Sequence, residues 1–301
     1  MVSPYPYLKI IRPFNCFLVG FSLYIGILIT MGHDILFSNL YLFTIGTIIV
    51  TLVSAGGFVV NDIYDLEIDK INQPLRILPS QQISLTAAKV YTIILFTLGF
   101  ILSLYALTIP TTINLGYLPP FFVIIGIIFL ILYASYLKKL GVVGNLVITG
   151  LSAITFIIGG LFINDVTRAF FPLLLVISLQ YSREIIKDVE DIKGDVEASD
   201  FMFSLPTVIG VRNTIAIGKL LLLSAIICTF LPFTISNFEY FRSWAVIGFA
   251  IILDLILVYS IIILRGTDDN LIMQAKKVKK ILKVGIAVGL VGLALNPYTL
   301  I

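Results

Sequence analysis

Two stretches of the sequence carry acidic residues at the same spacing. The first places Asp62, Asp65 and Asp69 at positions i, i+3 and i+7, and the second places Asp188, Asp191 and Asp195 in the same way. On an α-helix, residues at this spacing lie within about 60° of one another, and Asn61, four residues before Asp65, shares their face. Because like charges so arranged repel one another, the repeated pattern indicates a function rather than two solvated helix ends.

Facing carboxylate clusters are typical of Mg²⁺ binding. Hard cations take oxygen ligands, and Mg²⁺ usually bridges a few carboxylates to the phosphates of a substrate. The Gly56-Gly57 pair is not followed by the Gly-Lys-Ser/Thr of a nucleotide-binding loop. We therefore predict a Mg²⁺ site and a lipid diphosphate as the phosphorylated substrate, since an apolar chain can accept the tail of that substrate.

The elements that position these acids must lie in a membrane. Of the 301 residues, 59% are hydrophobic and only 12% are charged, whereas about a quarter of a soluble domain is charged. This composition excludes an extramembrane domain. Cys16 and Cys228 lie in apolar surroundings, which argues against a disulfide framework or a thiolate metal site. The single histidine, His33, excludes paired-histidine haem ligation, a Ser-His-Asp hydrolase and a His-x-x-x-His zinc enzyme.

The apolar runs predict an all-α, polytopic membrane protein that is a bundle of about nine transmembrane helices. The predicted spans are residues 14–32, 40–60, 88–109, 118–137, 143–163, 169–187, 208–232, 243–264 and 281–299. Both acidic stretches then follow spans that end on the same side of the membrane. We expect them to face each other across the bundle.

The distribution of basic residues predicts the orientation. With nine spans, 18 of the 20 Lys and Arg residues fall on the side that holds the N-terminus and both acidic stretches, and only Arg168 and Arg242 fall on the other side. Because cytoplasmic loops carry the excess of Lys and Arg, we expect a cell-membrane protein with the acids and the N-terminus at the cytoplasmic face and the C-terminus outside.

At these acidic motifs the sequence resembles the UbiA superfamily of intramembrane prenyltransferases, which is marked by N-D-x-x-D-x-x-x-D and D-x-x-x-D motifs on a nine-helix bundle. The resemblance extends over nearly the whole chain and includes residues 12–15, 69–72, 138–145, 183–195 and 204–206. Within the superfamily it is most similar to the archaeal digeranylgeranylglyceryl phosphate synthases. It implies a single transmembrane domain over 1–301 that uses Mg²⁺ to transfer a geranylgeranyl group from geranylgeranyl diphosphate to geranylgeranylglyceryl phosphate, forming an ether lipid.

The resemblance also implies roles for individual residues. The residues expected to carry catalysis are Asn61, Asp62, Asp65 and Asp191. The residues expected to hold Mg²⁺ are Asn61, Asp62, Asp65, Asp69, Asp188, Asp191 and Asp195. The residues expected to contact the substrates are Asn15, Arg76, Tyr133, Lys138 and Lys187, and Lys193 is a further cation available to a headgroup. Two positions depart from the family pattern, since Gln73 replaces a phosphate-binding arginine and Gln81 replaces a turn glycine.

The remaining charged residues have simpler interpretations. Glu67 and Glu190 fall off the acidic face, so we expect both to be solvated. The lysine-rich stretch from Lys276 to Lys283 is expected to contact lipid headgroups. Asp254 lies near the middle of the eighth predicted span, where a carboxylate is costly, so we expect it to contact a neighbouring helix or the acceptor.

Two other functions are compatible with parts of the pattern. A prenyltransferase that acts on a 4-hydroxybenzoate, quinone-precursor or chlorophyll-type acceptor would use the same acidic motifs. A cation-coupled transporter would also place acids in a bundle, but transporter sites usually lie near the midplane. We expect an isoprenyl diphosphate, a lipid acceptor and membrane lipids as partners, and no nucleic acid or obligate protein partner.

Overall fold

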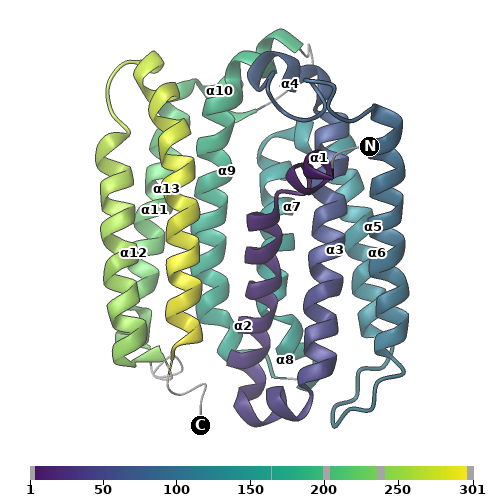
Figure 1. The fold of residues 1–301 in the computed structure, drawn as a ribbon. Coiled ribbons are helices and arrows are strands. Elements are labelled where there is room, and N and C mark those ends of the chain that lie inside the picture. The colour runs from purple at the N-terminus through teal and green to yellow at the C-terminus, as the bar shows by residue number, and fades with distance from the viewer. Residues whose placement is uncertain (1–3, 164, 199–203, 236–240, 297–301) are drawn as a thin grey trace.

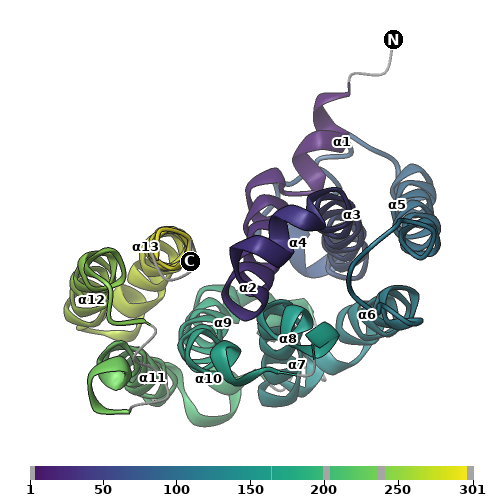
Figure 2. The ribbon, with the colours of Figure 1, turned by 90° about the horizontal axis from the view of Figure 1, so that it is seen from below.

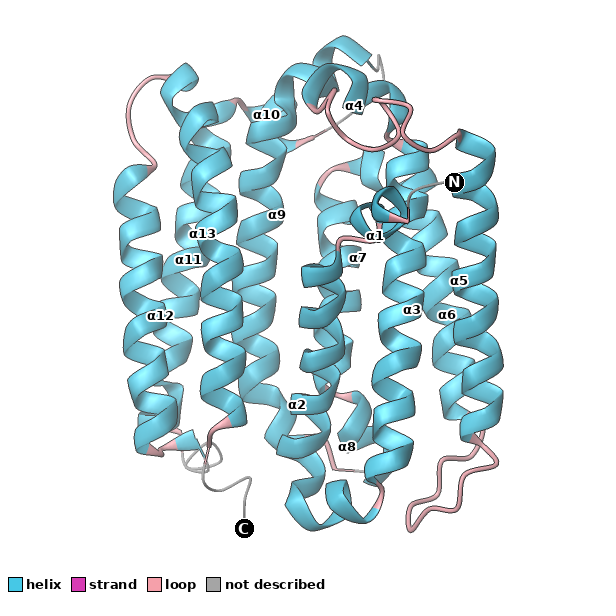
Figure 3. Ribbon diagram, viewed as in Figure 1, coloured by secondary structure: helices cyan, strands magenta, loops and turns pink. Residues whose placement is uncertain are grey.

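The protein is a bundle of long helices that run roughly parallel to one another (Figure 1). The computed structural model describes residues 4–163, 165–198, 204–235 and 241–296. Within these ranges every regular element is a helix, and the helices are joined by loops (Figure 3). The α-helices are α1 (Tyr5–Ile10), α2 (Pro13–Ser38), α3 (Leu40–Tyr64), α4 (Leu66–Asn72), α5 (Leu85–Ala106), α6 (Leu118–Ser135), α7 (Val142–Ala153), α8 (Ile158–Ile163), α9 (Phe170–Ala198), α10 (Leu205–Ile209), α11 (Val211–Thr234), α12 (Trp244–Ile263) and α13 (Asp268–Ala294).

The described residues contain the long apolar helices that a multi-pass bundle requires. Seven helical segments are long and apolar enough to span a membrane, and they correspond to α2, α3, α5, α6, α9, α11 and α12. The predicted span 143–163 is a broken segment, in which a 3₁₀ turn (Ile154–Phe156) separates α7 from α8. The first part of the last predicted span, residues 281–294, belongs to the longer α13, which already begins at Asp268, and residues 297–299 of that span lie outside the described residues. The protein is therefore a multi-pass, all-α membrane protein, as predicted.

The broken segment packs unusually closely against α2. A side chain at Gly26 of α2 would come within 2.6 Å of the Phe156 Cα, and one at Gly159 of α8 would come within 2.8 Å of the Ile27 Cα. Real Cβ atoms are not found at such distances, so only glycine permits this approach. The contact brings the 3₁₀ turn directly against α2. The apolar pattern of residues 143–163 by itself predicts a continuous helix at this point.

Successive crossings are antiparallel, so short elements alternate between the two ends of the bundle. The helices α1, α4 and α10 belong to one end of the bundle, while α8 and the 107–117 loop lie at the other (Figure 1). Both acidic stretches belong to the end that carries α4. This arrangement agrees with the predicted placement of the two motifs on one side of the membrane.

The helices form two packed groups with α9 between them (Figure 2). One apolar core is made mainly by α2, α3, α5 and α6, and a second is made by α9, α11, α12 and α13. A third cluster, which includes Ile25, Phe171 and Leu290, joins α2 to α9 and α13. Large apolar side chains such as Trp244 and Leu255 are exposed on the outside, where a lipid bilayer would cover them.

Asp254 contacts a neighbouring helix. Its Oδ2 accepts a hydrogen bond of 2.9 Å from the Thr229 hydroxyl of α11. The contact lies between α11 and α12, and Asp254 is not among the residues that line the cavities between α2, α3, α6, α7 and α9. The structure therefore supports a helix–helix contact for this residue rather than a place beside the acceptor.

Candidate active site

The first acidic motif lies at the junction of α3 and α4. The helix changes direction at Asp65, but the backbone pattern continues, because Asp65 N–H donates to Asn61 O (2.9 Å) and Asp69 N–H donates to Asp65 O (2.8 Å). The three carboxylates consequently keep a common side, as the spacing predicts. Asp62, Asp65 and Asp69 are all buried, and the Asn61 amide donates to Asp65 Oδ2 at 2.7 Å.

Each of these three acids is paired with a cation from a different part of the chain. Asp62 pairs with Arg12, and Asp65 pairs with Lys138. Both Asp69 oxygens accept hydrogen bonds from Arg76 Nη1, at 2.7 and 2.5 Å. The same Arg76 nitrogen lies 3.9 Å from Asp62.

These pairs set the ionisation of the motif. Burial alone would raise the pKa of Asp65, but the positive charge of Lys138 holds it below its usual value. In the same way, Asp65 raises the pKa of Lys138 despite burial. For Asp69, burial outweighs Arg76 and the pKa is raised. Asp65 and Lys138 are therefore a carboxylate and an ammonium ion at neutral pH.

The loop that carries Arg12 has an unusual backbone. Arg12 precedes Pro13 at the start of α2 and has φ of 54° and ψ of 66°, in the left-handed region. For a residue other than glycine this conformation costs roughly 1–2 kcal/mol. Such strain is common where a side chain is held for function, and here it accompanies the contact of Arg12 with Asp62.

The second acidic motif lies on α9, directly beside α4. The Asn72 side chain donates to the backbone oxygen of Asp191 at 2.9 Å. The Asn145 amide of α7 donates to Asp188 Oδ2 at 2.7 Å. Asp195 belongs to α9, but its side chain lies outside the described part of the structure. The two motifs, far apart in sequence, are thus brought together as predicted.

The donor chemistry of the site suits a hard divalent cation. The two motifs supply carboxylate and amide oxygens, which are the ligands that Mg²⁺ takes in proteins. Among the residues that the structure describes, no three acidic side chains are arranged to hold a metal ion. In this structure Arg12, Arg76 and Lys138 neutralise the acids of the first motif. Asp191 forms no salt bridge within the described chain.

A cavity of about 220 Å³ begins beside the motifs and lies between α2, α3, α6, α7, α9 and α13. Four of the residues predicted to take part in the site line it: Asn15, Asn61, Tyr133 and Lys187. Tyr133 is buried. The other end of the cavity is lined by apolar side chains, including Leu175 and Leu293.

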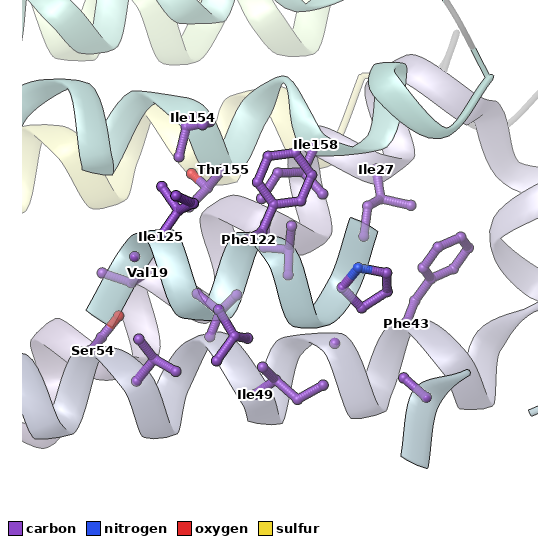
Figure 4. Close-up of a pocket in the computed structure, with 18 of the residues that line it drawn as sticks. Val19, Ile27, Phe43, Ile49, Ser54, Phe122, Ile125, Ile154, Thr155 and Ile158 are labelled. Carbon is purple, nitrogen blue, oxygen red and sulfur yellow. The ribbon is translucent and has the colours of Figure 1, made fainter. Parts of the chain in front are cut away.

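An apolar chamber of about 190 Å³ adjoins this cavity. Val19, Ser54, Leu130 and Leu151 line both spaces, so the two are contiguous. The chamber lies between α2, α3, α6 and the α7–α8 segment; among its lining side chains are Val19, Ile27, Phe43, Ile49, Ser54, Phe122, Ile125, Ile154, Thr155 and Ile158 (Figure 4). Between Asn61 at the motif and Phe43 in the chamber, α3 rises about 27 Å. Charged groups line the cavity beside the motifs and none lines the apolar chamber.

One prediction about a charged residue was wrong, and another is contradicted only in part, since Lys279 and Lys283 turn inward while Lys276, Lys277 and Lys280 are exposed. Glu190 is not solvated, because its side chain is only 7% exposed and forms a salt bridge with Lys279 of α13. Lys279 therefore faces the protein and not lipid headgroups. Lys283 also turns inward: it lines the cavity, and its ammonium group lies 4.6 Å from the Phe14 ring. By contrast, the Glu67 side chain is 72% exposed, as predicted.

Sequence reasoning missed a charged cluster on α9. Glu184 is buried and contacts Arg183 at 2.9 Å, Lys187 at 3.4 Å and Gln180 at 3.1 Å. Charged residues inside a membrane span are rare and usually functional, and this rule singles out Arg183 and Glu184 from their positions in the chain alone. Arg12 and Asn145 were also missed, although both lie in the segments that carry the family resemblance.

The two departures from the family pattern have distinct surroundings. Gln73 reaches the second motif, because its amide donates to Glu190 Oε1 at 3.4 Å. Gln81 has φ of 56°, so the position where the family has glycine retains a glycine-like backbone. The turn is therefore preserved, and where the family has an arginine, a neutral Gln73 amide contacts the Glu190 carboxylate of the second acidic stretch.

Comparison with known proteins decides the family. The UbiA prenyltransferase family matches residues 19–284. The chain belongs to this family.

UbiA prenyltransferases of known name and structure resemble this one over almost its full length. A digeranylgeranylglyceryl phosphate synthase from Sulfolobus acidocaldarius is 35% identical over 280 residues, which cover 93% of this chain and 94% of the relative. A solved digeranylgeranylglyceryl phosphate synthase structure is 31% identical with a TM-score of 0.66, over 100% of this chain and 99% of that one. A UbiA homologue from Archaeoglobus fulgidus bound to GPP and Mg²⁺ shares the fold, with a TM-score of 0.62, 17% identity and coverage of 96% and 100%.

Proposed function

We propose that this UbiA prenyltransferase transfers a geranylgeranyl group from geranylgeranyl diphosphate to the free hydroxyl of geranylgeranylglyceryl phosphate, forming an ether lipid. The main support is the full-length similarity to digeranylgeranylglyceryl phosphate synthases. The cavity agrees with it, since a polar end beside two acidic motifs continues into an apolar chamber. An isoprenyl diphosphate and a lipid acceptor both have this combination of a charged head and an apolar tail.

In this proposal the acidic motifs hold Mg²⁺ through Asn61, Asp62, Asp65, Asp69, Asp188, Asp191 and Asp195. The bound ion would neutralise the diphosphate as it leaves the donor. The homologue solved with GPP and Mg²⁺ supports this assignment by analogy. Asn61, Asp62, Asp65 and Asp191 are the residues to which we assign the largest catalytic contributions.

The cations that pair with the first motif have a second role. Arg76 and Lys138 neutralise Asp69 and Asp65 in the substrate-free protein. A diphosphate placed beside the motif offers these cations additional oxygen partners, and hydrogen bonds between ionised groups are the strong ones. Arg76, Lys138 and Lys187 would in this way hold the diphosphate, while Asn15 and Tyr133 line the space occupied by the reacting carbon.

The proposed reaction breaks the bond between C1 of the donor and the diphosphate oxygen, and the electron pair leaves with the diphosphate. The allylic carbon then forms a bond to the acceptor hydroxyl oxygen, and the hydroxyl proton passes to a diphosphate oxygen or to a carboxylate such as Asp62. No histidine is needed, and His33 packs on Phe37 in the latter part of α2. Exclusion of water by the apolar walls protects the allylic cation until the acceptor reacts.

We also propose that the end of the bundle carrying α4 faces the cytoplasm, with the N-terminus inside and the C-terminus outside. The uneven distribution of Lys and Arg supports this orientation. Water-soluble Mg²⁺ and released diphosphate would then exchange with the cytoplasm.

A panel of acceptors tests the proposed function. Purified protein is incubated with Mg²⁺, labelled geranylgeranyl diphosphate and, in separate reactions, geranylgeranylglyceryl phosphate, 4-hydroxybenzoate and a naphthoate. We expect an acid-stable ether lipid from the first acceptor and no product from the aromatic acceptors. A ring-prenylated aromatic product without any ether lipid would overturn the proposed acceptor and favour an aromatic prenyltransferase.

The apolar chamber predicts a substitution that changes donor length preference. Gly126 of α6 lines the chamber, and a Cβ there would meet no atom within 4 Å. Gly126→Leu therefore places a side chain in open space without backbone strain. We expect kcat/KM for geranylgeranyl diphosphate to fall about tenfold or more relative to that for the shorter geranyl diphosphate, because loss of a few methylene contacts is worth about 1–3 kcal/mol.

The matched control for this prediction is Gly248→Leu. Gly248 lies on α12, where a Cβ would also meet no atom within 4 Å, but it lines neither cavity. We expect this variant to retain the wild-type ratio of the two donors. An equal loss with both donors in Gly126→Leu would mean that the chamber does not hold the donor tail.

A further inference from the structure

The wall of the cavity carries more positive than negative charge. Four cations line it, namely Arg12, Arg183, Lys187 and Lys283, whereas Glu184 is its only acidic lining residue within the described chain. Arg12 is neutralised by Asp62. Arg183 and Lys187 share the single carboxylate of Glu184. Since an excess of buried positive charge is costly without a counter-charge, this wall is suited to an anion.

Two of these cations have unused binding capacity. The Nε atom of Arg183 is buried and has no hydrogen-bond partner among the described residues, while its Nη1 contacts Glu184. Lys283 contacts the Phe14 ring, and the charged groups that act on it are two further cations, Arg183 and Arg12. No salt bridge to Lys283 is formed in the part of the chain that the structure covers.

The pair formed by Arg183 and Lys283 is distinct from the cations that bind the acids of the first motif. Arg76 and Lys138 pair with Asp69 and Asp65, and neither lines the cavity. Arg183 and Lys283 instead come from α9 and α13, on the opposite side from the apolar chamber between α2, α3 and α6. Arg183 and Lys283 therefore line the cavity, whereas Arg76 and Lys138 are engaged by the carboxylates of the first motif outside it.

Beyond Arg183 and Lys283, and past Gln180 on α9, the surface is mainly apolar. Along α9, Leu179 and Leu175 line the same cavity about one and two turns from Arg183, and along α13, Leu290 and Leu293 line it about two and three turns from Lys283. Two cations next to a row of apolar side chains fit a single-tailed lipid, whose phosphate head would contact the cations and whose tail would contact the apolar side chains.

We propose that Arg183 and Lys283 bind the phosphate monoester of the acceptor lipid, and that the tail of that lipid lies along α9 and α13. The donor tail then occupies the other branch, in the chamber between α2, α3 and α6. This inference rests on the proposed function, because it names the site of its second substrate. Arg183 donates from its guanidinium group in the forked geometry that suits phosphate, and Lys283 adds a second positive charge.

Lipid binding tests the proposal directly. Wild-type protein and the Lys283→Gln, Arg183→Gln and Lys280→Gln variants are titrated by calorimetry in detergent with geranylgeranylglyceryl phosphate and with geranylgeranylglycerol, which lacks the phosphate. Lys280 is the control because it lies exposed on the same helix. We expect Lys283→Gln and Arg183→Gln each to weaken binding of the phosphorylated lipid about 10- to 100-fold, with no change for the phosphate-free lipid, and Lys280→Gln to match wild type with both.

Other outcomes overturn the proposal. It is wrong if wild type binds the two lipids equally, or if the variants weaken both lipids to the same extent, since the second result indicates only a structural role. A parallel titration with an unreactive thiolo analogue of geranylgeranyl diphosphate should give wild-type affinity in Lys283→Gln, and selective loss of this donor analogue would assign the cations to the donor instead.

The binding test is separate from the test of the proposed function. If the phosphorylated lipid binds in a Lys283-dependent way but receives no prenyl group, the proposed reaction fails while the phosphate site stands. If transfer occurs but Lys283→Gln and Arg183→Gln leave both binding and the acceptor KM unchanged, the reaction stands and the phosphate site is wrong.

Discussion

Replacing Asp65 with asparagine will lower the turnover of prenyl transfer by about 10³-fold or more, and Asp191→Asn will have a similar effect. The structure places these two residues on adjoining elements, α4 being tied to α9 by the bond from Asn72 to the Asp191 backbone. If both carboxylates hold the same metal–diphosphate unit, removing either one disables it. The double variant should therefore be little slower than either single variant, as measured by steady-state transfer to the acceptor at saturating donor.

The choice of asparagine and of controls follows from the contacts of each residue. Asp65 is buried beside Lys138. Asparagine and alanine both remove the negative charge that pairs with Lys138, but alanine would in addition leave a cavity. Glu67→Gln is a suitable control because that side chain is largely exposed, whereas Glu190 is unsuitable because of its buried contact with Lys279. Multiplicative losses in the double variant would contradict a shared site and indicate two independent ones.

Chelation of divalent cations will abolish prenyl transfer, and added Mg²⁺ will restore it. The first motif is neutralised by its basic partners, but Asp191 of the second motif forms no salt bridge within the described chain and would otherwise repel a diphosphate. The measurement is product formation in excess EDTA, followed by titration of Mg²⁺ back into the same sample. Asp69→Asn should raise the Mg²⁺ concentration that gives half-maximal activity, because it replaces a negatively charged carboxylate ligand with a neutral amide.

Full activity in excess EDTA would contradict the metal assignment. Thermal unfolding of the protein with and without EDTA is the companion measurement, since it separates loss of a catalytic ion from loss of the fold. We expect similar unfolding temperatures, because Arg12, Arg76 and Lys138 already neutralise the first motif without a metal.

The paired cations also explain how an acidic site can be stable when no substrate is bound. Buried carboxylates without partners would be costly, and here each acid of the first motif has its own basic partner. These partners come from the start of α2, from the loop after α4 and from the 3₁₀ turn after α6. The site is therefore assembled from segments that only the complete bundle brings together.

The sequence by itself determined the features that depend on neighbouring residues. Each apolar run is long enough to cross a bilayer, and a helix in lipid must satisfy its own backbone, so the crossings and their alternation follow from local composition. The spacing of Asp62, Asp65 and Asp69 places them on one side of a single helical segment, and this geometry is also local. The family motifs then predicted the chemistry.

Only the tertiary structure decided which groups meet. Asp62 pairs with Arg12, 50 residues away, and Glu190 pairs with Lys279 from the last helix. The lysine-rich stretch around Lys279 has the composition of a headgroup anchor, and no local pattern shows which lysine turns inward. Likewise, the break between α7 and α8 accompanies the close approach of Gly26 to Phe156. Such contacts depend on how helices pack across the bundle, because burial and charge pairing are properties of the whole fold rather than of any one segment.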